Sequence, residues 1–433
     1  MISTRFVRDN IDAIKESLER RKSDYPIDEL LELDKGWRAM QTELQELQHK
    51  RNVASEGIAK AKKEGKEVSE TISEMAGIKE RINGLEVKIA GDETRINYLL
   101  WNLPNVLDKS VPFGKDDSEN IEIRKWGKEG KRIETGHSEF LEKMDMLDVE
   151  RAAKIAGSRF YFMKGDLVLL EQALVRFATD FLYSKGYIPV VPPHLMKERY
   201  YRGVTGLGDF EDALYVATDT KESEGLNSNE HIEELMFMIS TSEHPMAAMH
   251  ADEVFSPKDL PIKYAGISQC FRREAGAHGK DTKGIFRVHQ FEKVEQFVFC
   301  RQEDSEAMYK ELVANEEEIW QKLNIPYHVV NICTGDIGVV AAKKYDIEGW
   351  FPSQGKYREL TSCSNCTDWQ SMRLNISYDE KGERKYVHTL NATGVSVQRA
   401  LVAIVENYLN SDNTITVPEV LVPYIGKKVL GKK

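Results

Sequence analysis

The stretch AGISQCFRREAGAHGKDTKGIFRVHQFEKVEQFVF, residues 265–299, decides the fold of this chain. Apolar and polar residues alternate on each side of a glycine-rich turn, which holds Gly276, Gly279 and Gly284. Alternation with a period of two is typical of strands, so the stretch predicts a long antiparallel hairpin. The residues of the second run that we expect to face the core are Phe286, Val288, Val294 and Val298.

The other face of this predicted hairpin carries charged and aromatic side chains. Arg287, Phe291 and Glu295 share that face in the second run, and Arg272 and Glu274 share a face in the first. A strand rises about 3.3 Å per residue, which places Phe291 and Glu295 roughly 13 Å apart, far enough to contact two parts of one extended ligand.

The hairpin is also unusually basic for an acidic chain. His278, Lys280 and Lys283 lie in or beside the turn, in addition to the arginines of the two runs. Two interpretations remain open: a solvated basic hairpin, or a site for nucleotide phosphates. The second is favoured, because an arginine on a rigid strand can hold a phosphate through two hydrogen bonds.

The familiar glycine-rich nucleotide motifs do not occur in the sequence. Gly279-Lys280 is followed by Asp281 and lacks the leading glycine of a P-loop, and the glycines near 203–208 are too loosely spaced for a dinucleotide fingerprint. Phosphate would therefore be held by side chains on an antiparallel sheet and not at a helix N-terminus.

The composition excludes several classes of protein. The chain has 433 residues, is 41% hydrophobic and carries a net charge of −11, which suggests a soluble protein of two to three domains that does not coat nucleic acid through overall charge. No apolar run reaches the roughly 18 residues of a membrane span, and the first residues resemble no targeting signal. Five cysteines favour a reducing compartment, so we expect a cytoplasmic location.

The first hundred residues predict a coiled-coil arm. Apolar residues fill nine of ten successive a/d heptad positions from Leu30 to Ala61, with Arg51 as the exception, and a second heptad run extends from Val68 to Leu99. The polar stretch between them is too short to let the chain cross back, so the two helices must be antiparallel.

The far end of this predicted arm is basic. Between residues 48 and 66, the acidic residues Glu56 and Glu64 accompany six basic ones: Lys50, Arg51, Lys60, Lys62, Lys63 and Lys66. The cluster is either a solvated helix surface or a stripe that follows a phosphate backbone. Arg51 lies on the seam, where a residue that sets the helix register is expected more than a ligand.

Composition also suggests the domain boundaries. We expect an N-terminal helical domain over 1–105, a linker over 106–135 because that run is polar and contains glycine, and a second domain over 136–433. Within the second domain, residues 166–185 predict an apolar amphipathic helix that ends at Gly186, and 221–233 predict a mobile loop.

The spacing of Cys363 and Cys366 is compatible with zinc, but a structural zinc site needs a second ligand pair. Only the scattered Cys270, Cys300 and Cys333 remain, so no structural zinc is expected. Buried thiols are the favoured interpretation, and redox chemistry is the alternative.

Four stretches give the chain a specific resemblance to the seryl-tRNA synthetases, which are class II aminoacyl-tRNA synthetases. They are Thr241-Ser242-Glu243, the run 271–297, GKYRELTSCSNCTDWQ at 355–370, and NATGVSVQRALVAIVENY at 391–408. Together with the coiled coil, the resemblance covers essentially the whole chain. It implies an α+β protein, in which an antiparallel helical coiled coil precedes a catalytic domain with an antiparallel β-sheet flanked by helices.

The resemblance implies that the chain activates L-serine with ATP and transfers it to the 3′-terminal adenosine of tRNA(Ser), with tRNA(Sec) as a second candidate. Arg272, Glu359 and Arg399 would be catalytic, Phe291 would stack on adenine, and Glu274 would fix the adenine end. The ATP-binding positions that it implies are Arg272, Arg273, Glu274, Arg287, Val288, Phe291, Glu359, Leu360, Thr361, Ser362 and Arg399.

The same resemblance assigns the remaining partners. Mg²⁺ would be held by Glu359 and Ser362, the basic residues of the arm would bind tRNA, and the helix 166–185 would build a homodimer. The serine-binding positions would be Thr241, Ser242, Glu243, Arg272, Glu295 and Thr393.

The chain departs from the family pattern at Gln398, Ser240 and Met372, where glycine, proline and arginine are usual. None of these changes removes a ligand side chain, although Gln398 places the packing around Arg399 in question. Two alternatives stay open. The first is a synthetase paralogue that loads a protein carrier, which the coiled-coil arm argues against because such an enzyme binds no tRNA. The second is a non-catalytic dimeric tRNA-binding protein, which the retained site residues argue against.

Overall fold

The structure is a computed structural model that describes residues 3–65, 67–206, 214–217, 235–274 and 283–431. The chain divides into two compact units, Met1–Leu103 and Pro104–Lys433. Several predictions fall outside the described residues: the turn with Gly276, His278, Gly279 and Lys280, the basic Lys66, and the loop 221–233.

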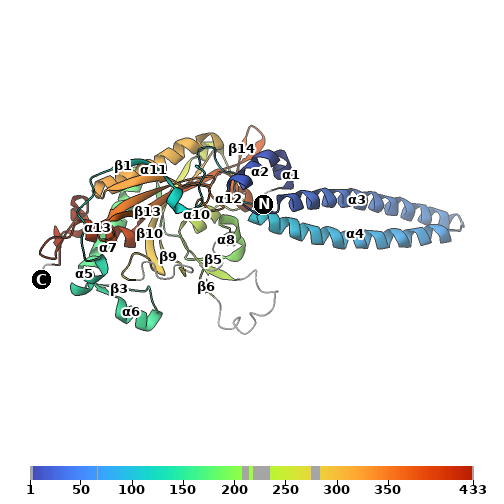
Figure 1. Cartoon of the computed structure of the whole chain (residues 1–433). Coiled ribbons are helices and arrows are strands. Elements are labelled where there is room, and N and C mark those ends of the chain that lie inside the picture. The colour runs from blue at the N-terminus through green and yellow to red at the C-terminus, as the bar shows by residue number, and fades with distance from the viewer. Residues whose placement is uncertain (1–2, 66, 207–213, 218–234, 275–282, 432–433) are drawn as a thin grey trace. The chain divides into compact units, whose positions relative to one another are not determined.

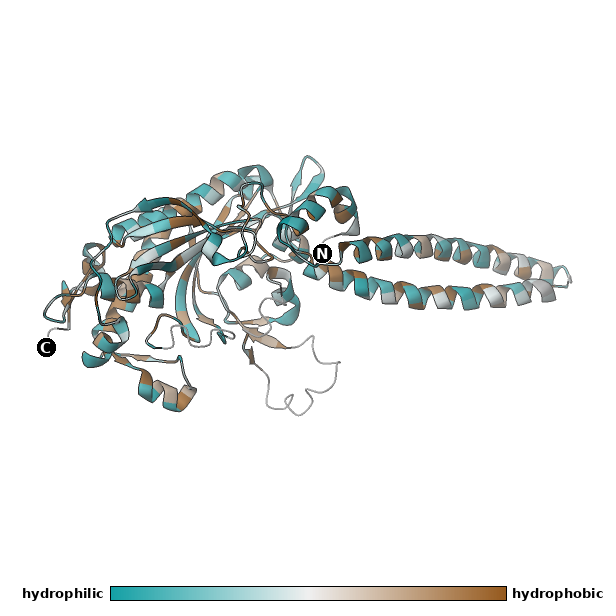
Figure 2. Cartoon of the chain, in the orientation of Figure 1, coloured by the Kyte–Doolittle hydropathy of each residue, from teal (hydrophilic) through white to brown (hydrophobic). Residues whose placement is uncertain are grey.

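The described residues of the first unit form the helices α1 (Thr4–Asp9), α2 (Ile11–Arg20), α3 (Ile27–Lys63) and α4 (Ser69–Asn102). The antiparallel coiled coil predicted from the heptads is confirmed: Leu44, Ile82, Leu85 and Ile89 are buried between α3 and α4. Apolar residues recur along both helices between polar ones (Figure 2). Arg51 is half-buried on the seam, while its neighbours on the outer face are exposed.

Ion pairs across the arm align the two long helices. Arg81 Nε lies 2.8 Å from Glu43 Oε1, and Arg95 Nε lies 2.7 Å from Glu29 Oε1. Each arginine donates a second hydrogen bond to the other carboxylate oxygen. Exposed pairs such as these add little stability, but two-point contacts at two positions favour one register over its neighbours.

The second unit is built on one sheet of eight strands (Figure 1). All neighbouring pairs are antiparallel except β4 with β9. The strands, in their order across the sheet, are β1 (Ile121–Trp126), β11 (Tyr327–Asn331), β12 (Lys343–Phe351), β13 (Lys356–Asn365), β16 (His388–Ser396), β10 (Gln290–Cys300), β9 (Ile262–Phe271) and β4 (Ile188–Val190).

Strand β10 shows how the sheet separates its core face from its site face. Val294 and Val298 join the main core, which the helices α7 (Asp166–Ser184), α11 (Ser305–Lys322) and α13 (Val397–Asn407) complete. On the opposite side, Phe297 and Phe299 pack in a second cluster with Tyr201 and Ile239. The remaining odd-numbered residues of β10 face open cavities, described below.

Shorter elements surround this sheet. The helices are α5 (His137–Lys143), α6 (Val149–Ala156), α8 (Glu198–Val204), α10 (Glu243–Ala248), α12 (Trp369–Leu374) and α14 (Val422–Ile425). The strands of the small sheets are β2 (Leu147–Asp148), β3 (Phe162–Met163), β5 (Leu195–Lys197), β6 (Val216–Ala217), β7 (Met236–Met238), β8 (Val254–Phe255), β14 (Ser377–Glu380), β15 (Glu383–Tyr386), β17 (Ile415–Thr416) and β18 (Val429–Leu430). Within the described residues, no helix is long and apolar enough to cross a membrane.

The predicted hairpin is present as β9 and β10, which pair from Phe271 with Gln290 to Ile262 with Phe299. It is shorter than expected, because β10 begins at Gln290 and the alternation does not extend back to Phe286 and Val288. Both of these residues are nevertheless buried in the main core, as predicted. Glu274 lies beyond β9 with φ +51°, so it reaches the site by a turn of the backbone and not by strand alternation.

The stretch 106–135, expected to be a linker, is part of the second unit. Its strand β1 pairs with β11 at the edge of the eight-stranded sheet, and Leu107 and Val111 pack against Val330 and Ile332. The strand escaped prediction because five of its six residues are exposed, so burial imposes no apolar alternation on it.

Candidate functional site

Two adjoining cavities lie on the site face of the sheet and share Arg272, Lys293, Glu359 and Thr393. The first cavity is also lined by Glu274, Phe286, Arg287, Val288, Phe291, Leu360, Ser396, Gln398 and Arg399. The second cavity encloses about 570 Å³, and its further lining includes Thr241, Glu243, Glu295, Ser362, Cys366, Asn391 and the loop 335–341.

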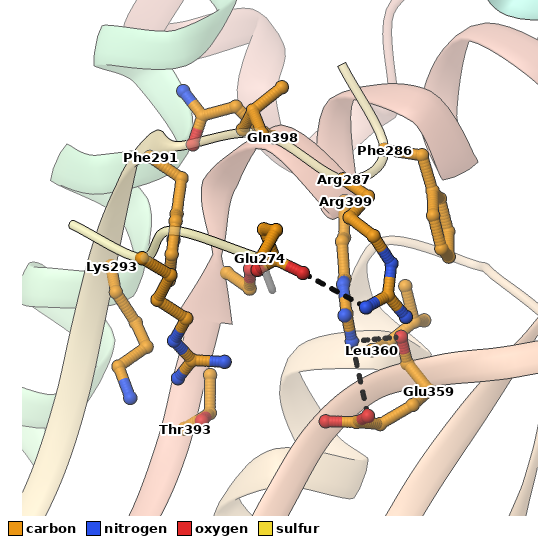
Figure 3. A pocket seen from close by; sticks show the side chains of 13 residues that line it. Glu274, Phe286, Arg287, Phe291, Lys293, Glu359, Leu360, Thr393, Gln398 and Arg399 are labelled. Carbon is orange, nitrogen blue, oxygen red and sulfur yellow. Dashed lines mark hydrogen bonds and ion pairs between the residues drawn. The ribbon is translucent and has the colours of Figure 1, made fainter. Parts of the chain in front are cut away.

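Two arginines lie over two aromatic rings in the first cavity. The guanidinium carbon of Arg272 is 5.2 Å from the centre of the Phe291 ring, and that of Arg399 is 5.2 Å from the centre of the Phe286 ring. Arg287 Nη1 donates to Glu274 Oε2 over 2.9 Å. These side chains line one space, around which Figure 3 shows Glu274, Phe291 and Arg399. Such a space offers flat apolar surfaces for a base and cations for its phosphates.

Arg399 is held in place by Glu359. Its Nη1 donates to the backbone oxygen of Glu359 over 2.9 Å and lies 3.3 Å from the carboxylate Oε2 of the same residue (Figure 3). Arg399 stands in the first turn of α13, where the helix dipole disfavours a cation, so this carboxylate offsets an unfavourable position.

A β-bulge brings Glu359 and Ser362 to the same face of β13. Ile347 pairs with Thr361 and Glu348 with Glu359, which leaves Leu360 between them without a partner in β12. In a regular strand, two residues that are three positions apart lie on opposite faces of the sheet. The extra residue of the bulge places Glu359 and Ser362 on the same face. The Glu359 side chain is 47% exposed, and the protein around it disfavours its charge only in part; Arg399, Lys344 and Arg272 outweigh that effect and lower its pKa, so the residue is ionised.

The second cavity presents carboxylates and a hydroxyl. Glu295 Oε2 lies 2.6 Å from Lys293 Nζ, and both side chains are buried. Thr393 pairs with Glu295 across the sheet, and Gln370 Nε2 donates to Glu243 Oε1 over 2.9 Å. Burial, with Glu295 nearby, raises the pKa of Glu243 to about 7. Burial also raises the pKa of Glu295.

This set of groups fits a small ligand that carries an ammonium and a hydroxyl. The carboxylates can accept hydrogen bonds from both groups, and Arg272, which is shared with the first cavity, can bind an anionic group between the two spaces. The arrangement therefore suits an amino acid next to a nucleotide.

Most of the residues expected at the site line one of the cavities. Three do not. Arg273 is exposed, and Ser242 is fully buried, where its hydroxyl donates to Gly266 O. Thr361 is buried, and its hydroxyl accepts a hydrogen bond from Trp320 Nε1. The side chains of Ser242 and Thr361 therefore pack inside the protein, next to residues that line the cavities.

Lys293 lines both cavities, although the sequence did not predict it as a site residue. The available signal was its position between Phe291 and Glu295 on one face of β10. A lysine between two residues of the ligand-facing side needs a partner, because a buried charge is costly when unpaired.

One of the three departures from the family pattern, Gln398, has a structural role for its side chain. Gln398 Oε1 accepts a hydrogen bond from Glu292 N over 2.8 Å, and its Nε2 donates to Glu171 Oε1 over 3.0 Å. It therefore joins β10 and α7, and Arg399 keeps its contacts. Ser240 O accepts from Arg272 Nε over 3.4 Å. Met372 is buried in α12.

Known proteins match both parts of the chain. A sequence model of the seryl-tRNA synthetase N-terminal domain matches residues 1–107, and one of the class II tRNA synthetase core domain (G, H, P, S and T) matches residues 226–408. A serine--tRNA ligase of Methanocella arvoryzae is 47% identical, over 98% of this chain and 99% of that protein. The chain belongs to the seryl-tRNA synthetase family.

Solved structures agree with this membership. The crystal structure of seryl-tRNA synthetase from Pyrococcus horikoshii complexed with ATP has a TM-score of 0.89 at 43% identity, and 99% of each chain is covered. The cytoplasmic serine-tRNA ligase of Naegleria fowleri in complex with AMP has a TM-score of 0.84 at 37% identity, with 97% of this chain and 95% of that chain covered. The resemblance noted in the sequence is thus confirmed, and the chain is an aminoacyl-tRNA synthetase, a ligase that uses ATP.

The basic residues of the arm lie where a partner could reach them. Lys50, Lys60, Lys62 and Lys63 are exposed on α3, whereas Arg51 is half-buried on the seam. In the second unit, Cys363 and Cys366 are both buried, and Asn391 Nδ2 donates to Cys366 Sγ over 3.5 Å.

Proposed function

We propose that this synthetase condenses L-serine with ATP to seryl-adenylate and pyrophosphate, and then transfers serine to the 3′-terminal adenosine of tRNA(Ser). The observation that carries the proposal is Arg272, which lies between a cavity of arginines and aromatic rings and a cavity of carboxylates. In that position one guanidinium can contact the α-phosphate and the serine carboxylate together.

The adenylation step needs charge neutralisation more than a general base. A serine carboxylate attacks the α-phosphorus in line with the leaving pyrophosphate, and two anions must approach each other. Arg272 and Arg399 supply positive charge along that path, and Arg287, paired with Glu274, extends it. Phe291 provides the ring on which adenine is expected to stack.

Mg²⁺ is expected to bind together with ATP, and the side chains of Glu359 and Ser362 are suitable ligands for it. Magnesium in nucleotide sites is usually held by one or two carboxylates together with phosphate oxygens and water. Glu359 is ionised, and its side chain is 47% exposed to the cavity. Ser362 lines the second cavity beside it. When bound, the ion would neutralise charge on the phosphates.

Serine would be selected by hydrogen bonding, because its side chain is too small for apolar fit. Glu295 and Thr393 can hold the hydroxyl, and Glu243 with Thr241 can hold the ammonium. Alanine would leave buried polar groups unpaired, which a site of this kind rejects strongly.

The arm and the surface of α7 supply the expected macromolecular contacts. The exposed lysines of α3 would follow the tRNA backbone. Leu169, Tyr183, Ile188 and Val191 expose apolar surface on α7 and around β4, which supports a homodimer through this face. A cytoplasmic location stays a prediction from the cysteine content.

Pyrophosphate exchange and tRNA charging, measured together, test the proposal. Serine alone should support rapid exchange with ATP, and tRNA(Ser) transcript should be charged. Exchange without charging of any tRNA would indicate the carrier-loading paralogue, and no exchange would indicate a non-catalytic protein. Parallel charging of a tRNA(Sec) transcript decides whether this second candidate is a substrate.

A further inference from the structure

Asn105 reaches two pocket-lining loops with one side chain. It is the second residue of the second unit, and only 7% of it is exposed. Its Nδ2 donates to Val340 O and to Cys366 O, each over 2.8 Å, with Thr367 Oγ1 at 3.2 Å. Val340 and Cys366 both line the second cavity, where serine is proposed to bind.

The backbone around Asn105 strengthens this connection. Asn105 N donates to Val339 O over 2.8 Å, and Asp108 N donates to Ala342 O over 2.9 Å. The segment therefore runs along the loop 335–341, which contributes seven consecutive residues to the cavity lining. That loop connects β11 with β12, and the hydrogen bonds from the segment at 105–108 hold its far end, while Asn120 holds its near end through Asp336.

The second loop holds a strained residue. Thr367 has φ +47°, which is an unfavourable region for a β-branched side chain. Thr367 N donates to Asn365 Oδ1 over 2.9 Å, and its hydroxyl lies 3.3 Å from Asn105 Oδ1. Such strain persists only where neighbouring groups hold it, and Asn105 is one of those groups.

The amide is specifically required by this geometry. Two carbonyl oxygens converge on Nδ2, while Oδ1 accepts from Val106 N over 2.9 Å. An aspartate has nearly the same shape but no donor, so it would set a carboxylate oxygen against two carbonyls. An alanine would leave both carbonyls unpaired in a buried place.

We propose that Asn105 is a positioning residue of the amino-acid site: it ties the loop 335–341 to Cys366 and so sets the width of the serine cavity. The inference rests on the proposed serine site. Asn105 contacts residues of the second cavity and does not line the first. Its loss is therefore expected to act on serine and to leave ATP binding nearly unchanged.

Steady-state pyrophosphate exchange with the full chain tests this. Asn105→Asp should raise the KM for serine by about tenfold or more and change the KM for ATP by less than about twofold. Asn105→Ser keeps one hydrogen-bond donor and should raise the KM for serine by an intermediate amount. This variant tests the positioning role of Asn105 if the aspartate variant does not fold. Thermal unfolding is measured for each variant.

Asn331→Asp is the matched control. Asn331 Nδ2 donates to Ser110 O over 3.0 Å and so ties the same segment to β11, but it lines neither cavity. Its KM for serine should stay near that of the parent. The inference is overturned if the Asn105 variants leave the KM for serine unchanged, raise both KM values equally, or lower only kcat. Failure of the parent to exchange pyrophosphate with serine would instead reject the proposed function.

Discussion

Thr393 stands directly opposite Glu295 because a bulge removes one residue of β16 from the pairing. Val294 pairs with Val395 and Glu295 pairs with Thr393, so Gly394 is skipped. Without the bulge, Glu295 would face a glycine that offers no hydroxyl. A Cβ at position 394 would lie 3.1 Å from Val294 O, tighter than ordinary contact, which is why glycine suits the bulged position.

This alignment gives the first prediction. Glu295→Gln should raise the KM for serine by about hundredfold, about 3 kcal/mol of binding, because it removes a buried charge that is hydrogen-bonded to the ligand. The KM for ATP should change little, since Glu295 lines only the second cavity. Both constants are measured by pyrophosphate exchange. A change in the KM for ATP alone would mean that the two cavities have been assigned the wrong way round.

A second prediction concerns the residue shared by both cavities. Arg272→Ala should lower the kcat/KM of serine-dependent exchange, with a loss of about 3 kcal/mol of transition-state stabilisation. The reason is that one guanidinium binds both the phosphate and the carboxylate. Arg301→Ala is the control: Arg301 follows β10 and pairs with Asp304 away from both cavities. Exchange by Arg272→Ala within about threefold of the parent would remove Arg272 from the reaction.

Glu243 leads to a prediction about pH. Its pKa is raised to about 7, mainly by burial, so the carboxyl is largely protonated below neutrality in the free enzyme. Holding the serine ammonium requires the ionised form. The kcat/KM for serine should therefore rise as pH increases through about 7 and level off above it.

Glu243→Gln is the variant that identifies the group. Its kcat/KM for serine should be low and nearly independent of pH over the same range, because the amide does not titrate. His244 does not explain the rise, since burial, with Lys293 and Arg272 nearby, lowers its pKa to about 3. An equal rise in Glu243→Gln would assign the titration to another group.

The elements that burial patterns define could be predicted from the sequence. The coiled coil was predictable because its seam must be apolar every three to four residues, and Leu44, Ile82 and Leu85 are buried as that pattern requires. The hairpin was predictable because one face of β10 packs in the core. Where both faces are exposed, as in β1, burial imposes no such pattern, and the alternation from Ile121 to Arg124 is too short to distinguish a strand from a linker.

Most residues that line the two cavities could be chosen from the sequence, but their geometry could not. Bulges decide that Glu359 and Ser362 share a face and that Thr393 meets Glu295, and a bulge leaves no periodic signal in the sequence. Asn105 gave no signal either, because its partners are backbone carbonyls more than 200 residues away along the chain. Such contacts depend on the path of the chain and not on the type of the partner residue.

The last prediction concerns the arm. Deleting residues 35–95 and joining the ends with a short Gly-Ser turn should leave serine-dependent exchange nearly intact and abolish charging of tRNA(Ser). The seam of α3 and α4 is satisfied within the first unit, and both cavities are lined by residues of the second. Adenylation therefore does not need the arm, whereas the transfer step needs a bound tRNA.

A charge-reversal variant tests the same point without a deletion. Lys60, Lys62 and Lys63 are exposed, so changing all three to Glu should spare the fold, raise the KM for tRNA strongly and make charging less sensitive to salt, because about three phosphate contacts are lost. The matched control changes Lys35 and Lys79, which are exposed elsewhere on the arm, to Glu. If the deletion variant charges tRNA at a rate comparable to the parent, the arm is structural and the exposed lysines do not bind the tRNA backbone.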